Sequence, residues 1–495
     1  MGDGNAVKAV AGRVICFIAL LLVLATLFTA VILAERFLRD EAVAYEDPAQ
    51  HFKYGSTGGE RNLGFPYWVW KALPRVCEEH LPPGGLESLG FVVEEGRDLP
   101  VGMSKRRHLG IDRVFLNCAA CHSSTVRTHK DATPKLVLGM PAARLNLMAF
   151  EQFMHDCVRD VRFGPDNLIP VMQDMGAPMG ALDRYVVYPL AIHIMRDRVI
   201  GLLHRLRFFQ SQPDWGPGRV DTFGSSKGLF NFPFEDLPAR EMLGTADFPS
   251  VWLQGPRETM QLHWDGNNTR VQERNLNASF GTGATPPIID HDAIEKIQDW
   301  LWTLQPPAYP FEIDQTLAAR GRPVYEQYCA ACHGKDGRDF SGETVGEVVP
   351  IEAIGTDRWR LDSFTPTLAR NLWAVYAGYE QYRFRNFRKT WGYANMPLDG
   401  LWLRAPYLHN GSVPTVWDLL QPADQRTAIF YRGNDLYHPS RLGFVWDQAA
   451  EGERQYFLFD TSLPGNGNHG HEGEAYGTEL PDDDKWALVE YLKTF

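Results

Sequence analysis

Two copies of the pentapeptide C-x-x-C-H constrain this chain more than any other feature of its sequence. Two thiols at this spacing on a short helical turn can each form a thioether with a haem vinyl group, and the next residue then brings an imidazole beneath the iron. The pattern therefore predicts two covalently bound haem c groups. The predicted attachment points are Cys118, Cys121, Cys329 and Cys332, and the predicted iron ligands are His122 and His333.

A zinc site built from the two C-x-x-C pairs is one alternative, and a redox-active dithiol is another. The pairs of a zinc site usually lie tens of residues apart and need no histidine after them. Here the pairs lie in opposite halves of a chain of 495 residues, and a histidine follows both. The sequence therefore favours haem attachment.

The N-terminal apolar segment is the second constraint. Residues 14–34 form an uncharged, largely apolar run, VICFIALLLVLATLFTAVILA. As a helix this run would be about 31 Å long, which is enough to cross the core of a bilayer. Lys8 and Arg13 precede it and favour a cytoplasmic N-terminus. We expect a single uncleaved membrane anchor and a periplasmic or otherwise extracytoplasmic body; a cleaved signal peptide, whose apolar core is usually shorter, is the alternative.

The acidic balance of the chain argues against nucleic acid as a partner. Asp and Glu number 61 against 49 Lys and Arg, the formal net charge is −12 with His neutral, and no Lys/Arg block stands out. An acidic surface is compatible with a basic redox partner, although a charge that keeps the protein soluble is the simpler explanation. The partners we expect are membrane lipid around the N-terminal helix and a periplasmic or membrane electron donor or acceptor.

Three cysteines lie outside the two motifs. Cys16 falls in the apolar N-terminal run, and Cys77 and Cys157 remain. An exported compartment would allow a disulfide between these two residues. Because the sequence does not give their separation, two separate buried thiols remain the alternative.

Apolar periodicity predicts helices over several stretches. Residues 141–160 and 181–210 carry apolar positions at helical spacing. Residues 290–304 predict a helix that begins at Asp290 as N-cap. Further helices are expected directly before the second C-x-x-C-H motif and at the C-terminus. The predicted apolar face of the helix over 290–304 is Ile294, Ile297, Leu301 and Leu304, and that of the C-terminal helix is Trp486, Val489 and Leu492.

Residues 64–110 and 211–285 are rich in Gly, Pro and aromatic residues and are expected to be irregular. We therefore expect a mainly α fold with extensive irregular loops, made of two cytochrome c-like haem domains and an N-terminal transmembrane helix. The expected domains are a membrane anchor (1–36), a first cytochrome c-like haem domain with large loop insertions (37–305) and a second cytochrome c domain (306–495).

The group that fills the sixth position of each iron decides between electron transfer and O2 or peroxide chemistry. For the second haem the candidates lie in the segments LPGNGNHGHEGEAYG, ANMPLDG and RAPYLHNGSVP. A surface or hydrogen-bonded role is the alternative for each candidate. The residues are His469, His471, Met396 and His409.

For the first haem, His263, Trp264 and Asp265 bring together a proton carrier, an aromatic ring and a carboxylate in the segment LHWDGNN. This combination suits a distal pocket, whose polarity decides between O2 binding and activation. Met140 is a weaker candidate ligand, and an ordinary loop turn at Asp265-Gly266 is the alternative interpretation. His263 and Trp264 are the candidate catalytic residues.

Several longer motifs resemble those of the diheme cytochrome c peroxidase superfamily and, within it, the rubber-oxygenase-like branch of c-type cytochromes. The resemblance covers most of residues 60–495. The motifs include GFPYWVWKALP, GRDLPVGMSKR, LNCAACHSSTVR, LHWDGNNTRVQERN, YCAACHG, PLDGLWLRAPYLHNGSVPTVWDLL and FDTSLPGNGNHGHEGEAYGTEL.

The resemblance implies that the two motif histidines are proximal ligands and that His471 is the distal ligand of the second haem, ahead of Met396 and His409. It implies that Arg404 meets a haem propionate. Residues 473–475 interrupt the run that usually follows this distal histidine in the branch. The chain departs from the pattern of the branch directly after His471, where the geometry of the ligand depends on it.

For the first haem the resemblance implies an open distal side near Trp264, which His263 would close if it coordinated the iron. A Trp between the haems also shares electrons in the related methylamine-utilisation enzyme. A calcium ion between the two cores occurs in related peroxidases, and the sequence has no dedicated acidic loop for one.

These features together predict a membrane-anchored haem-dependent oxidoreductase of dioxygenase or peroxidase type. O2 or peroxide would be activated at the first haem, electrons would be supplied through the second, and the substrate would be apolar or a peroxide. The alternative is a membrane-tethered electron-transfer cytochrome in which both haems are six-coordinate and no substrate chemistry occurs.

Overall fold

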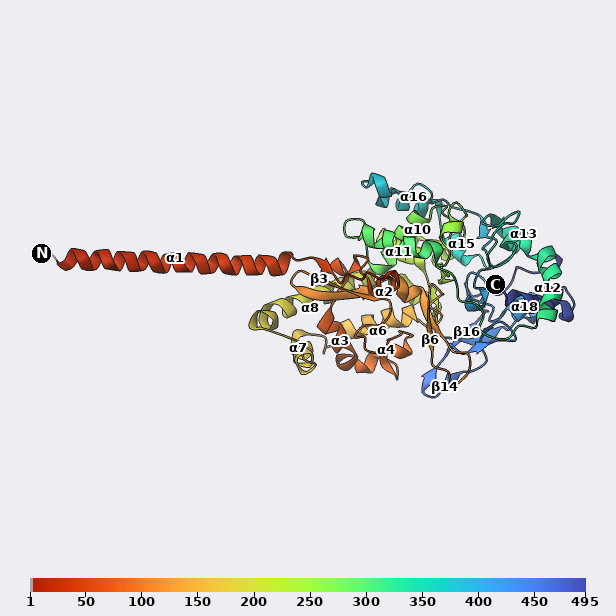
Figure 1. Cartoon of the computed structure of the whole chain (residues 1–495), viewed down its shortest axis with the longest axis horizontal. Coiled ribbons are helices and arrows are strands. Elements are labelled where there is room, and N and C mark those ends of the chain that lie inside the picture. The colour runs from red at the N-terminus through yellow and green to blue at the C-terminus, as the bar shows by residue number, and fades with distance from the viewer. Residues whose placement is uncertain (1–2) are drawn as a thin grey trace.

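One long helix, α1 (Asp3–Leu38), projects from the rest of the chain (Figure 1). The computed structural model describes residues 3–495. The segment Lys8–Leu38 is long and apolar enough to cross a membrane, and its most apolar stretch has a mean hydropathy of 2.9 with none of its residues buried. The end of α1 contacts the body, because the Arg36 guanidinium forms an ion pair with Asp183 and donates to the Gly110 carbonyl.

A four-stranded antiparallel sheet lies where α1 meets the body. Its strands are ordered β1-β3-β4-β2, and in the β3–β4 hairpin Met103 lies opposite Leu116 and Arg106 opposite Arg113. The sequence analysis did not predict this sheet, because arginines occupy buried positions of the hairpin and hide its alternation. The bounds are β1 (Glu41–Ala42), β2 (Phe65–Pro66), β3 (Met103–His108) and β4 (Ile111–Leu116).

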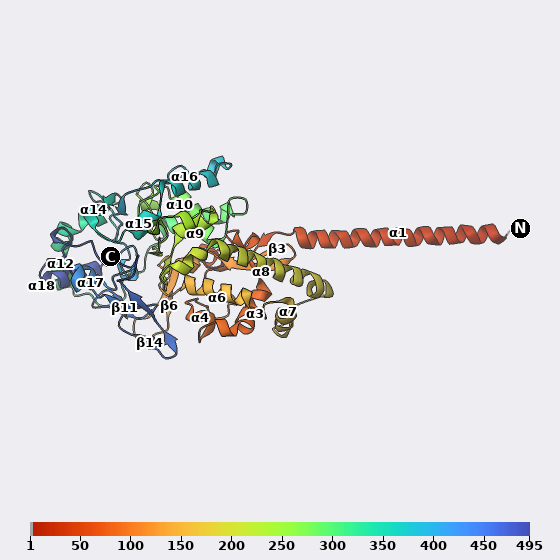
Figure 2. The ribbon, with the colours of Figure 1, turned by 180° about the vertical axis from the view of Figure 1, so that it is seen from behind.

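Helices pack on this sheet and form the core of the N-terminal half (Figures 1 and 2). The helices predicted over 141–160 and 181–210 are confirmed as α6 and α8. A disulfide joins Cys77, after α3, to Cys157 in α6, which resolves the alternative left open by the sequence. The main helices here are α2 (Pro48–Tyr54), α3 (Tyr67–Val76), α6 (Leu147–Arg159), α7 (Pro165–Asp174) and α8 (Tyr188–Arg205).

The stretch over 211–285 is only partly irregular. It contains two short helices, α9 (Thr222–Leu229) and α10 (Val271–Ala278), so the prediction of an unbroken loop was wrong. Both helices carry Gly or Asn residues that weaken the helical signal in the sequence. The Asp221 side chain caps α9 by accepting from the Gly224 amide at 2.8 Å.

The helix predicted over 290–304 is α11 (His291–Thr303), and Asp290 caps it as expected. The helix before the second motif is α12 (Gln315–Tyr328), and the C-terminal helix is α18 (Asp482–Leu492). These last two helices pack on each other in the part of the body farther from α1 (Figure 1). The three predictions are therefore confirmed.

One hydrophobic cluster joins the two halves of the chain. Val126, Met140 and Trp252 from the first half pack in the same cluster as Leu401 and Leu488 from the second. The halves are also joined by ion pairs from Arg127 to Asp435 and Glu451. The haem motifs therefore sit in one continuous body.

The remaining elements are short. The helices are α4 (Gly85–Ser88), α5 (Cys118–Cys121), α13 (Ala330–His333), α14 (Ile351–Ile354), α15 (Trp359–Ser363), α16 (Pro366–Val375) and α17 (Val416–Leu419). The strand pairs are β5 (Ser123–Val126) with β6 (Lys135–Leu138), β7 (Arg219–Val220) with β8 (Ala246–Asp247), β9 (Val348–Pro350) with β10 (Gly392–Ala394), β11 (Ile429–Arg432) with β16 (Phe457–Asp460), β12 (Tyr437–His438) with β13 (Gly443–Phe444), and β14 (Ala450–Glu451) with β15 (Arg454–Gln455).

The disulfide gives a first testable prediction. Replacing Cys77 and Cys157 by Ala should lower the free energy of unfolding by about 2–4 kcal/mol, because the unfolded chain loses a cross-link between residues 80 positions apart. Urea unfolding followed by far-UV circular dichroism measures this. Reducing the wild type with dithiothreitol should give a similar loss without creating a cavity. A Cys16→Ala control should unfold as the wild type does, and equal stability of all the forms would contradict the prediction.

Candidate haem sites

The first C-x-x-C-H motif forms a single helical turn, α5, that is fixed by its neighbours. The Asn117 side chain caps the turn by accepting from the Ala119 amide at 3.0 Å and donates to the Gly55 carbonyl at 3.0 Å. Gly102 passes so close to the Ala120 backbone that a Cβ atom there would lie 2.3 Å away, and its φ of +90° also requires glycine. The turn that carries the two thiols is therefore held from both sides.

The imidazole of each motif is oriented by a backbone carbonyl. The His122 Nδ1 atom lies 2.9 Å from the Pro249 oxygen, and the His333 Nδ1 atom lies 2.8 Å from the Met396 oxygen. Because a carbonyl oxygen only accepts, Nδ1 must carry the proton in both rings. Each Nε2 is then unprotonated and available to a metal, which is the arrangement typical of histidine ligands.

Burial shifts the pKa of the motif imidazoles and of the motif thiols in opposite directions. It lowers the pKa of His122 to about 4 and also lowers the pKa of His333, so both rings are neutral at pH 7. It raises the pKa of Cys118 to about 11 and that of Cys329 to about 12. A redox-active dithiol requires a lowered thiol pKa instead. Two thiols and a neutral imidazole at each motif fit a covalently bound haem.

A second imidazole faces His333. The ring centroids of His333 and His471 lie 6.2 Å apart. A metal ligated by two imidazole nitrogens at about 2 Å each would hold the centroids roughly 6 Å apart. The pKa of His471 is lowered to about 3, by burial first and by the neighbouring His333 second. The second site therefore has the dimensions and the neutral ligands for a six-coordinate haem iron.

The loop that carries His471 is clamped by Arg426. This guanidinium donates to the carbonyls of Asn468, Gly470 and His471, the last two at 2.9 and 3.2 Å. His471 itself has a φ of +47°, an unfavourable conformation that needs such support. The sequence analysis missed Arg426, because it stands in none of the motifs recognised there.

The other candidate ligands of the second haem are arranged differently. The Met396 carbonyl contacts the protonated Nδ1 of His333, so its backbone lies on the side of the ring away from Nε2. His409 stacks on the Tyr393 ring at 4.1 Å, and its Nε2 bonds the Tyr393 hydroxyl at 3.1 Å. His469 is exposed. The geometry favours His471 over these three residues.

Arg404 lies near the second site, where its charge contributes to the lowered pKa of His333. Its guanidinium pairs with the Asp399 carboxylate at 2.6 Å and donates to the Pro397 carbonyl at 2.7 Å. Its Nε is buried without a hydrogen-bond partner in the described part of the chain. Arg404 therefore already has a carboxylate partner, and its Nε remains free for a haem propionate.

His263 lies in a buried loop beside Asn267. Its Nδ1 is 2.6 Å from the Asn267 amide oxygen, so Nδ1 carries the proton and Nε2 has no assigned partner in residues 3–495. Burial lowers its pKa to about 4. The positive charge of Arg274 contributes to lowering the pKa of both His263 and His122, so Arg274 lies near each of these two rings. No imidazole of the described residues pairs with His122 as His471 does with His333.

Trp264 joins the segments that orient the two motif histidines. Its indole Nε1 donates to the Asp247 carbonyl at 2.8 Å, two residues before Pro249. Its own carbonyl accepts from the Ala394 amide at 2.8 Å, two residues before Met396. Trp264 therefore connects the segment that contacts His122 with the segment that contacts His333. Met140 is fully buried in the cluster shared by the two halves.

Glu151 on α6 is a further residue that the sequence analysis missed. One of its carboxylate oxygens is buried without a hydrogen-bond partner in the described chain, and burial raises its pKa to about 8. Its charge raises the pKa of Cys121, so it lies beside the first motif. In the sequence it resembles an ordinary surface residue of an amphipathic helix. Its burial beside a predicted haem became visible only in the fold.

The segment whose Met396 carbonyl orients His333 matches a known family. Residues 392–431 match the family model described as RoxA-like, cytochrome c-like. This segment contains the Met396 carbonyl, the Arg404–Asp399 pair and Arg426, so it is the structural support of the second site. The match supports a c-type cytochrome of the RoxA-like branch that carries covalently bound haem c.

Two proteins of Sinorhizobium fredii are similar to longer stretches of this chain. The protein named "Uncharacterized protein y4iJ" is 26% identical over 519 residues, which cover 83% of this chain and 84% of that protein. The protein named "Uncharacterized protein y4iM" is 31% identical over 293 residues, which cover 50% of this chain and 64% of that protein.

The clamp on the His471 loop gives a second prediction. An Arg426→Gln substitution removes most of the hydrogen bonds to the carbonyls of the His471 loop. The His471 side chain should then be held less firmly in place opposite His333. In the purified full-length protein, part of the second haem should then change from low spin to high spin in electron paramagnetic resonance (EPR) and optical spectra. Arg322→Gln, at an exposed ion pair on α12, is the matched control. Unchanged low-spin signals in the Arg426 variant would contradict a positioning role.

Glu151 gives a third prediction, on pH dependence. The folded protein holds this proton up to about pH 8, whereas the unfolded carboxyl releases it near 4.5. The resulting stabilisation is full below about pH 4.5 and is lost as the pH rises through about 8. Glu151→Gln should therefore gain about 1–3 kcal/mol of unfolding free energy relative to the wild type between about pH 5 and pH 8. Urea unfolding at both pH values tests this, with the exposed Glu326→Gln as control. A difference that does not depend on pH would refute it.

Proposed function

We propose that this chain is a membrane-anchored, exported diheme c-type cytochrome that acts as an oxidoreductase. The first haem would activate O2 or peroxide, and the second would supply electrons. The observation that carries the proposal is the asymmetry between the sites: His333 has a second imidazole 6.2 Å away, and His122 has no such partner in the described residues.

The second site has the features of an electron carrier. Two neutral imidazoles face each other, and Arg426 restrains the loop of one of them. Fixed ligands on both sides of an iron keep its coordination unchanged when its oxidation state changes, and they leave no position for a substrate. This supports electron storage and transfer, rather than substrate chemistry, at His333.

The first site has the groups that oxygen or peroxide chemistry needs. A haem bound there would supply the iron that binds and activates the oxidant. In the same neighbourhood, His263 is neutral with an uncommitted Nε2, which can accept or donate a proton. Glu151, beside Cys121, would keep its proton at neutral pH. Trp264, between the segments that orient His122 and His333, suits electron exchange between the haems.

The membrane attachment is also part of the proposal. The apolar helix α1 supports it by length and composition, and the Cys77–Cys157 disulfide is typical of an oxidising compartment outside the cytoplasm. A body held at a bilayer is well placed to meet an apolar, unsaturated substrate or a membrane-bound electron donor.

The experiment is low-temperature EPR of the oxidised full-length protein in detergent, with optical spectra after dithionite and after air or peroxide. We expect one low-spin and one high-spin haem. His471→Ala should make the second haem high spin as well, whereas His469→Ala, at an exposed neighbour, should leave both signals unchanged. Two low-spin haems that do not respond to O2 or peroxide would refute the enzyme and leave a tethered electron-transfer cytochrome.

A further inference from the structure

Arg113 is a buried cation with no counter-ion. Its side chain is 7% exposed, its Nε has no hydrogen-bond partner, and none of the ion pairs within residues 3–495 includes it. Arg106, directly opposite on β3, is also buried but is neutralised by Asp40 and Asp290 at 2.5 and 3.4 Å. A guanidinium does not deprotonate at neutral pH, and an unpaired buried charge is costly. Arg113 therefore lacks an anionic partner among the described residues.

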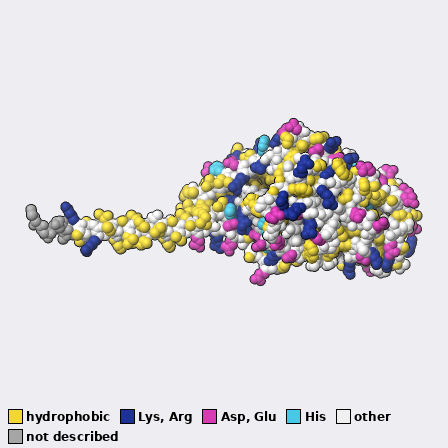
Figure 3. Space-filling model, turned by 90° about the horizontal axis from the view of Figure 1, so that it is seen from above, with side chains coloured by type: hydrophobic (Ala, Val, Ile, Leu, Met, Phe, Trp, Pro, Cys, Tyr) yellow, Lys and Arg dark blue, Asp and Glu magenta, His cyan; other side chains and the backbone are white. Residues whose placement is uncertain are grey.

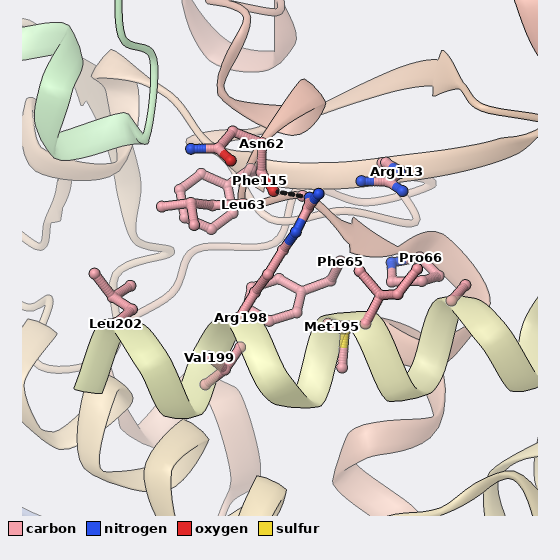
Figure 4. Close-up of a pocket in the computed structure, with 13 residues that line it drawn as sticks. Asn62, Leu63, Phe65, Pro66, Arg113, Phe115, Met195, Arg198, Val199 and Leu202 are labelled. Atoms are coloured by element: carbon pink, nitrogen blue, oxygen red, sulfur yellow. Dashed lines mark hydrogen bonds between the residues drawn. The ribbon is translucent and has the colours of Figure 1, made fainter. Parts of the chain in front are cut away.

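A pocket lies in front of Arg113, between the sheet and α8 (Figure 4). Arg198 reaches into it from α8 and donates to the Asn62 carbonyl at 2.6 Å, so a second cation approaches from the other wall. The proximity of Arg198 contributes, after burial, to lowering the pKa of Arg113 to about 10. The rest of the lining is mostly apolar, with Leu63, Phe65, Phe115, Met195, Val199 and Leu202.

The pocket is small, with a volume of about 30 Å³. This is roughly the room of two water molecules, so only part of a phosphate group would enter it and the rest of an amphiphile would stay outside. The wall on α8 continues back into the preceding turn η3 (Asp183–Val187), which lies beside the end of α1, where Asp183 pairs with Arg36 (Figures 1 and 2). One wall of the pocket therefore belongs to a segment attached at the base of α1.

The same segment exposes apolar side chains beside the pocket. Apolar atoms gather where α1 meets the body (Figure 3). Tyr185 is 71% exposed and Leu190 59% exposed, although both lie on a segment attached to α1. Tyr and aliphatic side chains that are exposed beside the end of a membrane helix are typical of segments that rest in a bilayer interface. The exposed apolar side chains of the segment are Leu182, Tyr185, Val186, Leu190, Ile194 and Ile200.

We propose that this pocket binds the phosphate headgroup of an anionic membrane phospholipid between Arg113 and Arg198, while the η3–α8 segment rests in the bilayer interface. The apolar lining and the exposed side chains of η3–α8 would contact the glycerol and acyl part of the lipid. The assignment rests on the membrane attachment proposed above. It would hold the body close to the bilayer in one orientation, rather than at the end of a free tether.

The test uses the full-length holoprotein in a neutral detergent and measures the midpoint of thermal unfolding. Phosphatidylglycerol should raise the midpoint of the wild type by about 2–4 °C, as expected for a ligand that binds only the folded state of a chain of this size. Phosphatidylcholine and inorganic phosphate should have little effect. Equal shifts with phosphatidylcholine would overturn the requirement for an anion, and equal shifts with inorganic phosphate would overturn the lipid assignment.

Variants separate the site from general lipid effects. Arg113→Met should abolish the shift without lowering the lipid-free midpoint, because an apolar side chain replaces an uncompensated charge. Arg198→Gln, at an exposed position, should weaken phosphatidylglycerol binding about tenfold even if the first variant folds poorly. Arg322→Gln, an exposed arginine on α12, should keep the full shift. A full shift in both pocket variants would refute the site.

Two readouts keep this proposal distinct from the proposed function. The haem spectra should be identical in all these variants, so a failure of the redox proposal leaves the lipid titration unaffected. Carbonate extraction of membranes tests the anchor by itself. Release of the chain by carbonate would overturn both the anchor and the lipid assignment, whereas retention without any phosphatidylglycerol shift would overturn the pocket alone.

Discussion

The hydrogen bond from each motif imidazole to a backbone carbonyl is the constraint on which the two sites depend. It fixes which nitrogen of His122 and His333 is free for iron, and it attaches each motif to a segment far away in the chain, at Pro249 and Met396. Thioether attachment alone would hold a haem at its edge but would not orient the ligand. Trp264 then ties the two carbonyl-bearing segments together, so the orientation of one site is coupled to that of the other.

On the opposite side of the second site, hydrogen bonds from Arg426 hold the loop that carries His471. Arg426 places a buried cation against three carbonyl oxygens and not against a carboxylate. The three carbonyl oxygens can all accept from the guanidinium only while the loop keeps its present backbone conformation. The buried charge therefore restrains that conformation. Residues 473–475 follow this clamped loop, within which His471 faces His333.

The sequence predicted what local patterns encode. The C-x-x-C-H motifs, the apolar N-terminal helix and the helix capped by Asp290 each depend on spacing within a few turns. The β3–β4 hairpin was missed, because its buried arginines resemble surface residues until their partners are known. The Cys77–Cys157 pairing, the role of Arg426 and the burial of Glu151 are set by contacts between distant segments, which no single stretch of sequence contains.

The cluster shared by the two halves has a consequence for how such a chain is made. Residues such as Met140 and Trp252 complete their packing only against Leu401 and Leu488, which are synthesised last. The first C-x-x-C-H turn, by contrast, packs on clusters built within the first half of the chain, through Ala119 and Ala120. Its surroundings can therefore form before the last residues are made, whereas Cys329 and Ala330 of the second turn contact the shared cluster and stay incompletely packed until the final helix is in place.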